Sequence, residues 1–588
     1  MKDGHSGNPL IVQSDMTLLL EVDNPLYEAA RDQLARFADL EKSPEYVHTY
    51  RITPLSLWNA AAAGFSAQSI VQALDTYSKY PVPDNVRVEV LDYANRYGRV
   101  KLIRDGEQLF LVSDDEALLA ELGRHKRLAP YIQERIGSLR LRMDPSRRGH
   151  IKQALVLAGY PPEDLAGYVQ GAPLQFSLLS RARSGEPFAL RSYQRQAVEA
   201  FHAAGQLRGG SGVVALPCGA GKTIVGMAIM EKLQCATLIL TTSTIATRQW
   251  IAEFLDKTDL REDTIGEYTG LRKQVRPVTV STYQIMTYRR NRLKANSLEE
   301  KYPHFALFNE EDWGLIIYDE VHLLPAPIFR ITAEIQARRR LGLTATLVRE
   351  DHRETEVFSL IGPKKYDAPW KDLERQGWIA AAECHEIRIP LPDELRLQYA
   401  LSDEKDKYRV AAENPRKFLV LDQLLAKHPH DSVLIIGTYL NQLLEAAQRY
   451  ACPIITGKTP VHQREQLFGE FRSGAIKRLI VSKVGNFAID LPDANVAIQV
   501  SGTFGSRQEE AQRLGRILRP KRHGLLAHFY TLVTRDTRDL EVAARRQLFL
   551  TEQGYRYEIL YEDEIGAWQP TTLALRAKPT CPKALQPG

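Results

Sequence analysis

One stretch constrains the fold of this chain more than any other. Residues 216–223, Leu-Pro-Cys-Gly-Ala-Gly-Lys-Thr, directly follow the apolar run Val213-Val214-Ala215. A glycine-rich turn between a strand and a helix directs several backbone N–H groups at one point, where the helix dipole also favours an anion. Lys222 can then reach the β- and γ-phosphates and the Thr223 hydroxyl can bind Mg²⁺. We predict a phosphate-binding loop. An ordinary strand-turn-helix remains the alternative, because Leu216 stands where the pattern has its first glycine.

An acidic motif further along the chain weakens that alternative. Asp319-Glu320-Val321-His322 follows the apolar run 315–317, so two carboxylates should lie just beyond the end of a strand. Phosphate-bound Mg²⁺ needs a hard oxygen ligand, which Asp319 can supply, and Glu320 could orient or deprotonate an attacking water. Such acidic pairs are common in loops, so the pair indicates a nucleotide site only in combination with Lys222.

From residue 187 onward, strand-like runs alternate with helical ones, which predicts an α/β fold with parallel sheets. The carboxyl ends of such strands are where a site is usually built. A charged stretch at 392–415 interrupts the alternation. The strands are expected at 237–240, 278–281, 315–318, 341–344, 433–437, 479–482 and 496–500, with a helix near 441–450.

The region before residue 187 is smaller and mixed. The runs 10–12 and 18–22 predict a β-hairpin, and 54–63 and 66–77 predict two helices, with Gly64 ending the first and Ser66 capping the second. Their spacing fits a helix-turn-helix. We favour a plain αα-hairpin, because residues 68–77 carry no Lys or Arg.

A linker is expected at 80–84, followed by strands at 86–91, 100–103 and 109–112. Basic residues then accumulate between Arg124 and Lys152. A solvated face and a phosphate-contacting surface both remain open for them.

Composition narrows the class of protein. The 588 residues suggest three to five domains, and a net charge of +5 permits nucleic-acid binding without arguing for it. The five cysteines are scattered and include no C-x-x-C pair, so a disulfide framework, a zinc module and an iron–sulfur cluster are not expected. With no apolar run of about 18 residues and no signal peptide, we expect a cytoplasmic protein without a membrane partner.

The last motif is Gln512-Arg-Leu-Gly-Arg-Ile-Leu-Arg519. On a helix, Gln512, Arg516 and Arg519 fall within about 60° of one another, opposite the apolar residues. Such a helix could be a solvated surface or could lean on a membrane. We favour a catalytic role, because arginines placed against a γ-phosphoryl group can contribute ~10³–10⁵ in rate.

Together these motifs resemble those of superfamily 2 helicases, and more closely those of the XPB (Ssl2/Rad25-like) DNA-repair helicases. The resemblance runs from about Arg191 to Tyr557. It is carried by 216–223, 319–322, 342–351 (Gly-Leu-Thr-Ala-Thr-Leu-Val-Arg-Glu-Asp), 482–485 with 490–492, and 508–516.

The resemblance implies two tandem RecA-like parallel-sheet domains preceded by small α+β domains. The expected limits are 1–79 for an N-terminal domain, 80–180 for a damage-recognition-like domain, 187–370 and 371–568 for the RecA-like domains, 392–415 for a thumb-like insertion and 569–588 for a disordered tail.

The resemblance also implies roles for residues at matching positions. Lys222, Asp319, Glu320, Gln512, Arg516 and Arg519 are expected to be catalytic, with the two arginines as fingers. Thr223 and Asp319 are expected to hold Mg²⁺. His322, Thr344, Thr346, Arg349, Glu350 and Asp351 are expected to couple hydrolysis to DNA movement. ATP is expected to contact Arg191, Gln194 (the adenine-recognising glutamine), Pro217, Cys218, Gly219, Ala220, Gly221, Lys222, Thr223, Gly485 and Asp490.

The implied activity is that of an ATP- and Mg²⁺-dependent 3′-to-5′ DNA helicase acting in nucleotide excision repair. A double-strand translocase without strand separation is the first alternative, and a non-motor DNA-binding scaffold is the second. The expected partners are DNA and a repair nuclease or other repair protein. The expected location is the nucleoid of a prokaryotic cytoplasm. Departures from the family at 486–488 and 502–504 leave the fine DNA contacts open.

Overall fold

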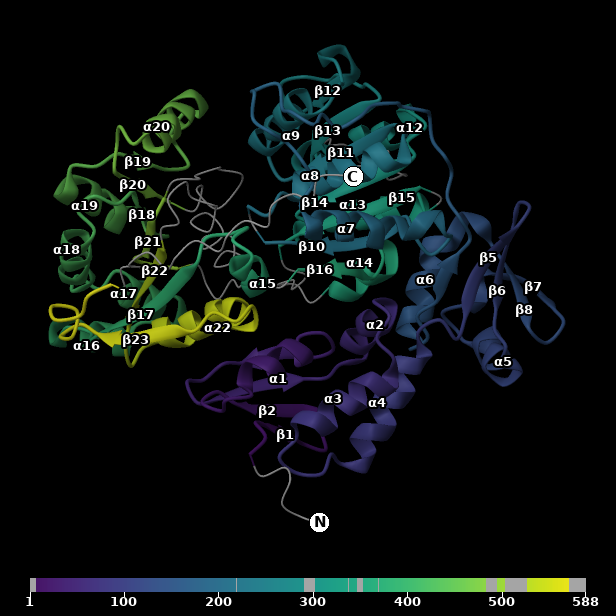
Figure 1. The fold of residues 1–588 in the computed structure, drawn as a ribbon, viewed down its shortest axis with the longest axis horizontal. Helices are drawn as coiled ribbons and strands as arrows, with labels where there is room; N and C mark the ends of the chain where they lie inside the picture. Colours follow the sequence, from purple (N-terminus) through teal and green to yellow (C-terminus); the bar gives the residue numbers. More distant parts are fainter. Residues whose placement is uncertain are drawn as a thin grey trace, which may run out of the picture.

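The computed structural model describes residues 7–217, 219–289, 302–336, 338–345, 353–368, 370–482, 494–502 and 526–570. Two small N-terminal units precede two larger lobes, each lobe built on one parallel sheet (Figure 1). The α/β fold class with two tandem parallel sheets is therefore confirmed.

The first unit is an antiparallel sheet covered by helices. Its strands lie in the order β1-β2-β4-β3, and its hydrophobic core includes Leu18, Tyr50 and Leu74. The predicted hairpin and the two predicted helices are present, with Ser66 accepting a hydrogen bond from the N–H of Ser69 as the helix cap. The elements are β1 (Leu10–Val12), β2 (Thr17–Glu21), α1 (Tyr27–Leu34), β3 (Asp39–Lys42), β4 (Val47–Arg51), α2 (Pro54–Ala62), α3 (Ala67–Tyr77) and α4 (Asp84–Arg96).

The strand predicted at 86–91 is wrong, because these residues belong to helix α4. Val86, Val88 and Val90 alternate along the sequence as a strand would, but Val88 is 64% exposed. The buried positions are Val86, Val90 and Ala94, which are spaced four residues apart on one face of a helix. Because α4 packs into the core of the first unit, that core extends past the predicted domain limit at residue 79.

The second unit is a five-stranded sheet in the order β7-β8-β6-β5-β9, and it confirms the strands expected at 100–103 and 109–112. Helix α6 attaches this unit to lobe 1 by packing on α13 (Ala326–Glu334) and α14 (Glu354–Leu360). Gly149 is needed at this contact, since a Cβ there would lie 2.3 Å from the Ala333 carbonyl oxygen. The elements are β5 (Lys101–Asp105), β6 (Gln108–Val112), α5 (Glu116–Arg124), β7 (Ile132–Ile136), β8 (Arg140–Met143), α6 (Arg148–Leu157) and β9 (Glu163–Leu165).

Lobe 1 is a seven-stranded parallel sheet in the order β12-β13-β11-β14-β15-β10-β16. Its central strands are buried on both faces, which is why they read as continuous apolar runs in the sequence. The elements are α7 (Ser192–His202), β10 (Ser211–Ala215), α8 (Lys222–Leu233), β11 (Thr237–Thr241), α9 (Thr244–Lys257), β12 (Ile265–Tyr268), β13 (Val278–Thr282), α10 (Tyr283–Met286), α12 (Leu307–Glu310), β14 (Leu315–Asp319), α13 (Ala326–Glu334), β15 (Arg339–Thr344), α14 (Glu354–Leu360) and β16 (Lys364–Asp367).

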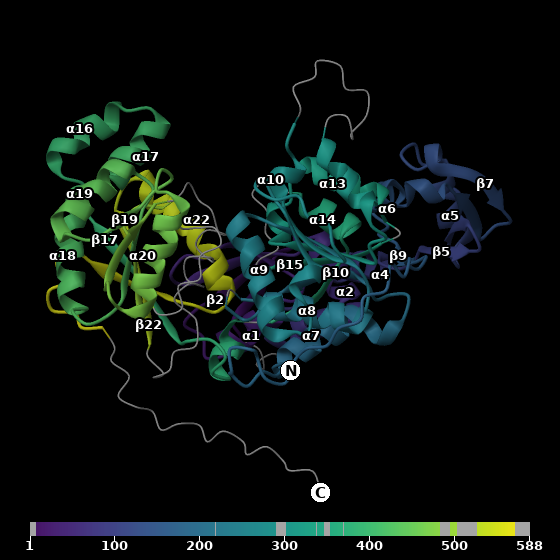
Figure 2. The ribbon, with the colours of Figure 1, turned by 90° about the horizontal axis from the view of Figure 1, so that it is seen from above.

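Lobe 2 repeats the plan of lobe 1. Its parallel sheet has the order β19-β20-β18-β21-β22-β17-β23, so the first to seventh strands of each lobe take the same places in their sheets. The insertion 392–415 forms helices α16 and α17 at one side of this lobe (Figure 2). After the connecting helix α15 (Trp370–Arg375), the elements are β17 (Ala382–Ile389), α16 (Asp393–Leu401), α17 (Glu404–Ala412), α18 (Lys417–Lys427), β18 (Val433–Ile436), α19 (Leu440–Tyr450), β19 (Ile454–Ile455), α20 (Val461–Ser473), β20 (Arg478–Val481), β21 (Val496–Gln499), β22 (Ala527–Thr534), α22 (Arg538–Glu552) and β23 (Tyr557–Tyr561).

The first unit touches both lobes. On lobe 1, the Asn59 side-chain oxygen accepts a hydrogen bond from the backbone N–H of Lys364 at 3.0 Å. On lobe 2, the Arg556 guanidinium donates to the Val22 carbonyl oxygen at 3.2 Å and lies over the ring of Tyr27. Leu548 of α22 belongs to the core of the first unit. This unit therefore bridges the two lobes.

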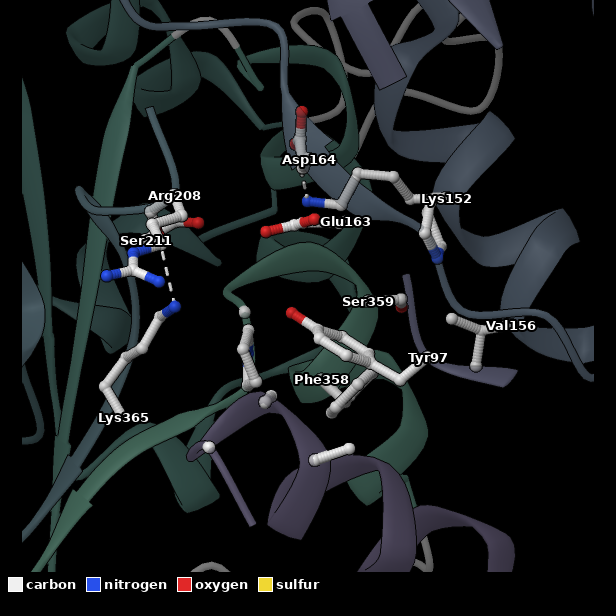
Figure 3. Close-up of a pocket in the computed structure, with 16 residues that line it drawn as sticks. Tyr97, Lys152, Val156, Glu163, Asp164, Arg208, Ser211, Phe358, Ser359 and Lys365 are labelled. Atoms are coloured by element: carbon white, nitrogen blue, oxygen red, sulfur yellow. Dashed lines mark hydrogen bonds and ion pairs between the residues drawn. The ribbon is translucent and has the colours of Figure 1, made fainter. Parts of the chain in front are cut away.

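A small polar pocket of about 170 Å³ lies where the two N-terminal units meet lobe 1 (Figure 3). Lys152 forms an ion pair with Asp164 at 3.2 Å, and the Lys365 ammonium donates to the Arg208 carbonyl oxygen at 3.1 Å. Each of these two contacts lies within one unit. The Lys152 ammonium also donates to the Gln336 side-chain oxygen at 2.9 Å, and this bond joins the second unit to lobe 1.

None of the helices in the described ranges is long and apolar enough to cross a membrane.

Candidate nucleotide-binding site

The glycine-rich loop has the backbone geometry that a phosphate loop requires. It connects the fully buried strand β10 to helix α8, which begins at Lys222. Gly219 and Gly221 have φ angles of 81° and 80°, in the left-handed region that favours glycine. A Cβ on Gly221 would also lie 2.6 Å from the Gln194 side-chain nitrogen. The α8 amino terminus is therefore reached through a turn that leaves its N–H groups accessible to an anion.

The departure at Leu216 is explained by packing. Leu216 is buried, and its N–H donates to the Thr344 carbonyl oxygen at 2.9 Å, so the residue continues the sheet contact of β10 with β15. The turn begins only after it. A glycine at this position would leave part of the lobe 1 core unfilled, and the two glycines that follow supply the turn.

Sheet order brings the predicted motifs together. Strands β14, β15 and β10 are adjacent and parallel, so their carboxyl ends lie at one edge of the sheet. Asp319 ends β14, Thr344 ends β15, and the loop leaves β10. The 97 residues that separate Lys222 from Asp319 in sequence therefore do not separate them in space.

Glu320 lies at the centre of this edge. Its Oε1 is 3.3 Å from the Lys222 ammonium nitrogen, and its Oε2 is 3.5 Å from His322 Nδ1. The same His322 nitrogen is 2.7 Å from the Thr344 hydroxyl. Although burial opposes it, the charges of Lys222 and His322 lower the pKa of Glu320, which keeps the carboxylate ionised. An ionised carboxylate beside a phosphate-binding lysine can orient a water or accept its proton.

Asp319 is held in place by two aromatic residues. The Trp250 indole N–H donates to Asp319 Oδ2 at 2.9 Å, and the Tyr283 hydroxyl donates to the Asp319 carbonyl oxygen at 2.8 Å. Burial and the neighbouring Glu320 raise the pKa of Asp319 to about 6. A nearby divalent cation would offset both effects by stabilising the ionised carboxylate. The Asp319 carboxylate and the Thr223 hydroxyl are hard oxygen donors, which are the ligands that Mg²⁺ prefers.

A cavity of about 530 Å³ opens beside the loop and is lined by Gly219, Gly221, Gln194, Arg191 and Trp378 among others. This volume lies in the range of small-molecule sites. The Arg191 guanidinium lies over the Trp378 ring, 4.8 Å from its centre. The Gln194 amide donates to the Ala220 carbonyl oxygen and accepts from the Arg191 N–H, so its orientation is fixed against the loop.

Four residues of this site were not predicted from the sequence. Trp250 and Tyr283 position Asp319 through hydrogen bonds. The Tyr193 hydroxyl donates to the Ala220 carbonyl oxygen at 2.7 Å, and Trp378 lines the cavity. Tyr193 could have been suspected from its place beside Gln194. The other three are distant in sequence from the motifs they support and carry no local signal.

Several predicted site residues lie outside the described residues, so their placement stays a prediction. They are Cys218, Thr346, Arg349, Glu350, Asp351, Gly485, Asp490, Gln512, Arg516 and Arg519. Within the described ranges, the structure brings together Arg191, Gln194, Pro217, Gly219, Ala220, Gly221, Lys222, Thr223, Asp319, Glu320, His322 and Thr344 around the loop and the adjacent strand ends.

Two tandem α/β lobes of the same strand order, with a phosphate loop and an acidic strand end in the first, define the class of two-lobed P-loop motor proteins. Family models agree with this class. The ERCC3/RAD25/XPB C-terminal helicase model matches residues 373–580, the Type III restriction enzyme res subunit model matches 187–349, and a Helicase conserved C-terminal domain model matches 10–137.

Curated relatives identify the family. The "DNA 3'-5' helicase XPB" of Kineococcus radiotolerans is 54% identical over 97% of this chain and 99% of its own length, and that of Mycobacterium tuberculosis is 54% identical over 96% and 99%. The "General transcription and DNA repair factor IIH helicase/translocase subunit XPB/SSL2" of Saccharomyces cerevisiae is 30% identical over 95% of this chain and 73% of its own length. The chain belongs to the XPB family of helicases.

Proposed function

We propose that this chain is an ATP-driven 3′-to-5′ DNA helicase or translocase that opens or remodels duplex DNA in nucleotide excision repair. The observation that carries the proposal is the convergence of Lys222, Asp319 and Glu320 at the edge formed by the adjacent strands β14, β15 and β10. Nearly full-length identity of 54% to bacterial DNA 3'-5' helicases supports the direction and the substrate.

The geometry of the described residues supports the following proposed roles. Lys222 and the N–H groups at the start of α8 bind the phosphates, while Asp319 and Thr223 would hold Mg²⁺, which would neutralise phosphate charge. Glu320 activates the attacking water, and the cavity beside Gln194 and Trp378 receives the base and sugar. Gln512, Arg516 and Arg519, which lie outside the described residues, are proposed to complete the site from lobe 2.

His322 and Thr344 are proposed to report hydrolysis to the DNA-contacting parts of lobe 1. The His322 imidazole lies within reach of the Glu320 carboxylate and of the Thr344 hydroxyl. A change in the charge or position of Glu320 on hydrolysis would therefore alter the bond that fixes the end of β15. The residues that follow β15, including Thr346 and 349–351, are proposed to carry this change to DNA.

DNA is the proposed macromolecular partner, contacted mainly through phosphates because a translocase must step over any sequence. A repair nuclease or another repair protein is a further proposed partner, and the proposed location is the nucleoid of a prokaryotic cell. We propose that the domain limits given above hold, with the first limit moved from 79 to about residue 97 so that α4 stays with its core.

The second candidate function is a double-strand translocase that never separates strands. The name of the Saccharomyces cerevisiae relative, a helicase/translocase subunit, supports this alternative. Strand displacement from a forked duplex and displacement of a triplex strand, measured side by side, discriminate the two. Triplex displacement without fork opening would favour the translocase.

The decisive test is ATP hydrolysis measured in parallel with no nucleic acid, single-stranded DNA, forked DNA and RNA. Stimulation by DNA and not by RNA is expected. In the Lys222→Ala variant, stimulated turnover should fall by at least about 10²-fold while most DNA binding remains, because the lysine binds phosphates of the nucleotide. Equal turnover in the wild type and the variant would refute the site.

A further inference from the structure

A cluster of two histidines and a glutamate lies at the amino end of the lobe 2 sheet, away from the nucleotide site in lobe 1. Glu383 and His385 point from the same face of β17, and His528 lies on β22 directly opposite Glu383 in register. One ligand atom from each of the three lies within 4.8 Å of the others. The strand period of two residues therefore places three metal-binding side chains on one face.

The distances suit a small divalent cation. Glu383 Oε2 is 3.7 Å from His385 Nε2 and 3.6 Å from His528 Nδ1. A tetrahedral ion with bonds of about 2.0–2.2 Å separates its ligand atoms by about 3.4 Å. The two distances from Glu383 are within a few tenths of an ångström of this value, and the two histidine ligand atoms lie within 4.8 Å of each other.

The surroundings of His385 are those of a metal ligand. The ring is buried, and neither of its nitrogens makes a hydrogen bond with any group in the described part of the chain. Buried polar atoms are rarely left without a hydrogen bond, so a ligand at Nε2 would supply a missing partner. On the other side of the ring, Nδ1 lies 3.0 Å from the Glu558 carboxylate of β23. A carboxylate behind a ligating histidine fixes the ring tautomer and strengthens the ligand.

The indole of Trp568 packs edge-on against His385 with ring centres 4.9 Å apart, which shields the cluster on one side. The half-exposed Glu558 and the partly exposed Glu383 leave a route from solvent on the other.

We propose that Glu383, His385 and His528 form a structural Zn²⁺ site, with Glu558 orienting His385 from behind. Two nitrogen donors and one carboxylate favour Zn²⁺ over Mg²⁺, which prefers oxygen ligands, so the ion of the nucleotide site does not compete. The scattered cysteines argue only against zinc modules that bind the metal through cysteine thiolates. They do not bear on a site made of two histidines and a glutamate. By joining β17 and β22, the ion braces the strand that follows residues 503–525, which carry the predicted arginine fingers.

The test uses the full chain, stripped with a chelator and then kept in excess Mg²⁺ so that the nucleotide site is filled. Zn²⁺ is titrated against a chromophoric competitor, the bound metal is counted by mass spectrometry, and Co²⁺ is substituted to read the ligand field from its visible absorption. We expect one Zn²⁺ per chain, a tetrahedral Co²⁺ spectrum and a higher midpoint of thermal unfolding with Zn²⁺ than with Mg²⁺ alone.

Three variants test the proposed Zn²⁺ site. His385→Gln should lose the stoichiometric Zn²⁺, and Glu558→Gln, on the exposed rim where folding is least at risk, should weaken binding about 10- to 100-fold. His462→Gln, which removes an exposed histidine of α20, should bind as the wild type does. Absence of stoichiometric Zn²⁺ uptake by the wild type, or equal affinity in the Glu558→Gln and wild-type proteins, would overturn the proposal.

Discussion

The Lys222 ammonium nitrogen lies 3.3 Å from the Glu320 carboxylate, so the phosphate-binding cation and the proposed catalytic base are joined as an ion pair. The phosphates of a nucleoside triphosphate bound at the loop would compete with the Glu320 carboxylate for the Lys222 ammonium group. The carboxylate freed in this way would then face the γ-phosphate. Binding of the substrate and release of the base are thus one event in this geometry.

The Glu320→Gln variant is expected to bind ATP and to lose hydrolysis. The amide keeps the size of the side chain but cannot accept a proton, so the turnover number should fall by about 10²-fold or more while nucleotide affinity is retained. Steady-state turnover and binding of a fluorescent nucleotide would be measured together. Glu199→Gln, which alters an exposed glutamate paired with Lys232, is the control and should hydrolyse ATP normally.

The Trp250→Phe variant tests the support of Asp319. Phenylalanine keeps a ring in the core but removes the N–H that donates to Asp319 Oδ2, so the carboxylate loses its fixed orientation. We expect the Mg²⁺ concentration for half-maximal turnover to rise about 10-fold. Trp313→Phe removes an equivalent buried indole bond, to the Leu307 carbonyl oxygen, far from the site. An equal Mg²⁺ shift in both variants would show that loss of stability, rather than loss of the Asp319 bond, is responsible.

The Gln194→Ala variant is expected to weaken nucleotide binding and base discrimination. Loss of the amide removes its hydrogen bonds to the Arg191 N–H and the Ala220 carbonyl oxygen. The loop is then no longer fixed against the wall of the cavity. The KM for ATP should rise about 10-fold and the preference for ATP over GTP should shrink. Gln196→Ala, on the exposed side of the same helix, should change neither value.

His48 gives a pH prediction for the contact between the first unit and lobe 2. Burial, Arg556 and Arg31 lower the pKa of His48 to about 4, against about 6.5 in an unfolded chain. A depressed folded pKa means that the unfolded state takes up the proton first. The corresponding stability is therefore full above pH 6.5 and is lost as the pH falls through 4.

The Arg556→Gln variant removes one of the charges that lower this pKa. NMR titration of the His48 ring should show a higher pKa in this variant, and the acid loss of stability should be smaller. Arg545→Gln, at an exposed position of α22, is the control. An unchanged His48 titration after Arg556→Gln would mean that burial and Arg31, without Arg556, set the pKa.

DNA affinity should fall steeply with salt, because phosphate contacts release counterions. The slope of log affinity against log salt, measured from low to moderate salt, counts those contacts. A flat dependence would argue against a motor that holds DNA by its backbone.

The sequence was informative where one local pattern sufficed. Continuous apolar runs predicted the buried parallel strands, and the loop from Leu216 to Thr223 with the pair Asp319-Glu320 predicted the nucleotide site before any strand order was known. The alternation at Val86, Val88 and Val90 misled, because two residues of a helical face happened to fit a period of two as well. Packing of α4 on the first unit, which no local pattern records, decided between the two.

Contacts between distant residues could not be predicted. Trp250 and Asp319 are 69 positions apart, and nothing near either residue indicates their hydrogen bond. The pairing of Glu383 with His528 depends on the register of β17 and β22, which follows from the complete strand order of lobe 2. Repetition of that order in both lobes emerged only from the structure.

The first unit is attached to lobe 1 through Asn59 and to lobe 2 through Val22 and Tyr27. If the angle between the lobes changes during hydrolysis, one of these attachments has to break or the unit between them has to deform. Either event would add a free-energy barrier to the motion. Contacts of the first unit, far from the nucleotide, would thus limit the rate of the lobe movement. A molecule that binds at these contacts could change that rate.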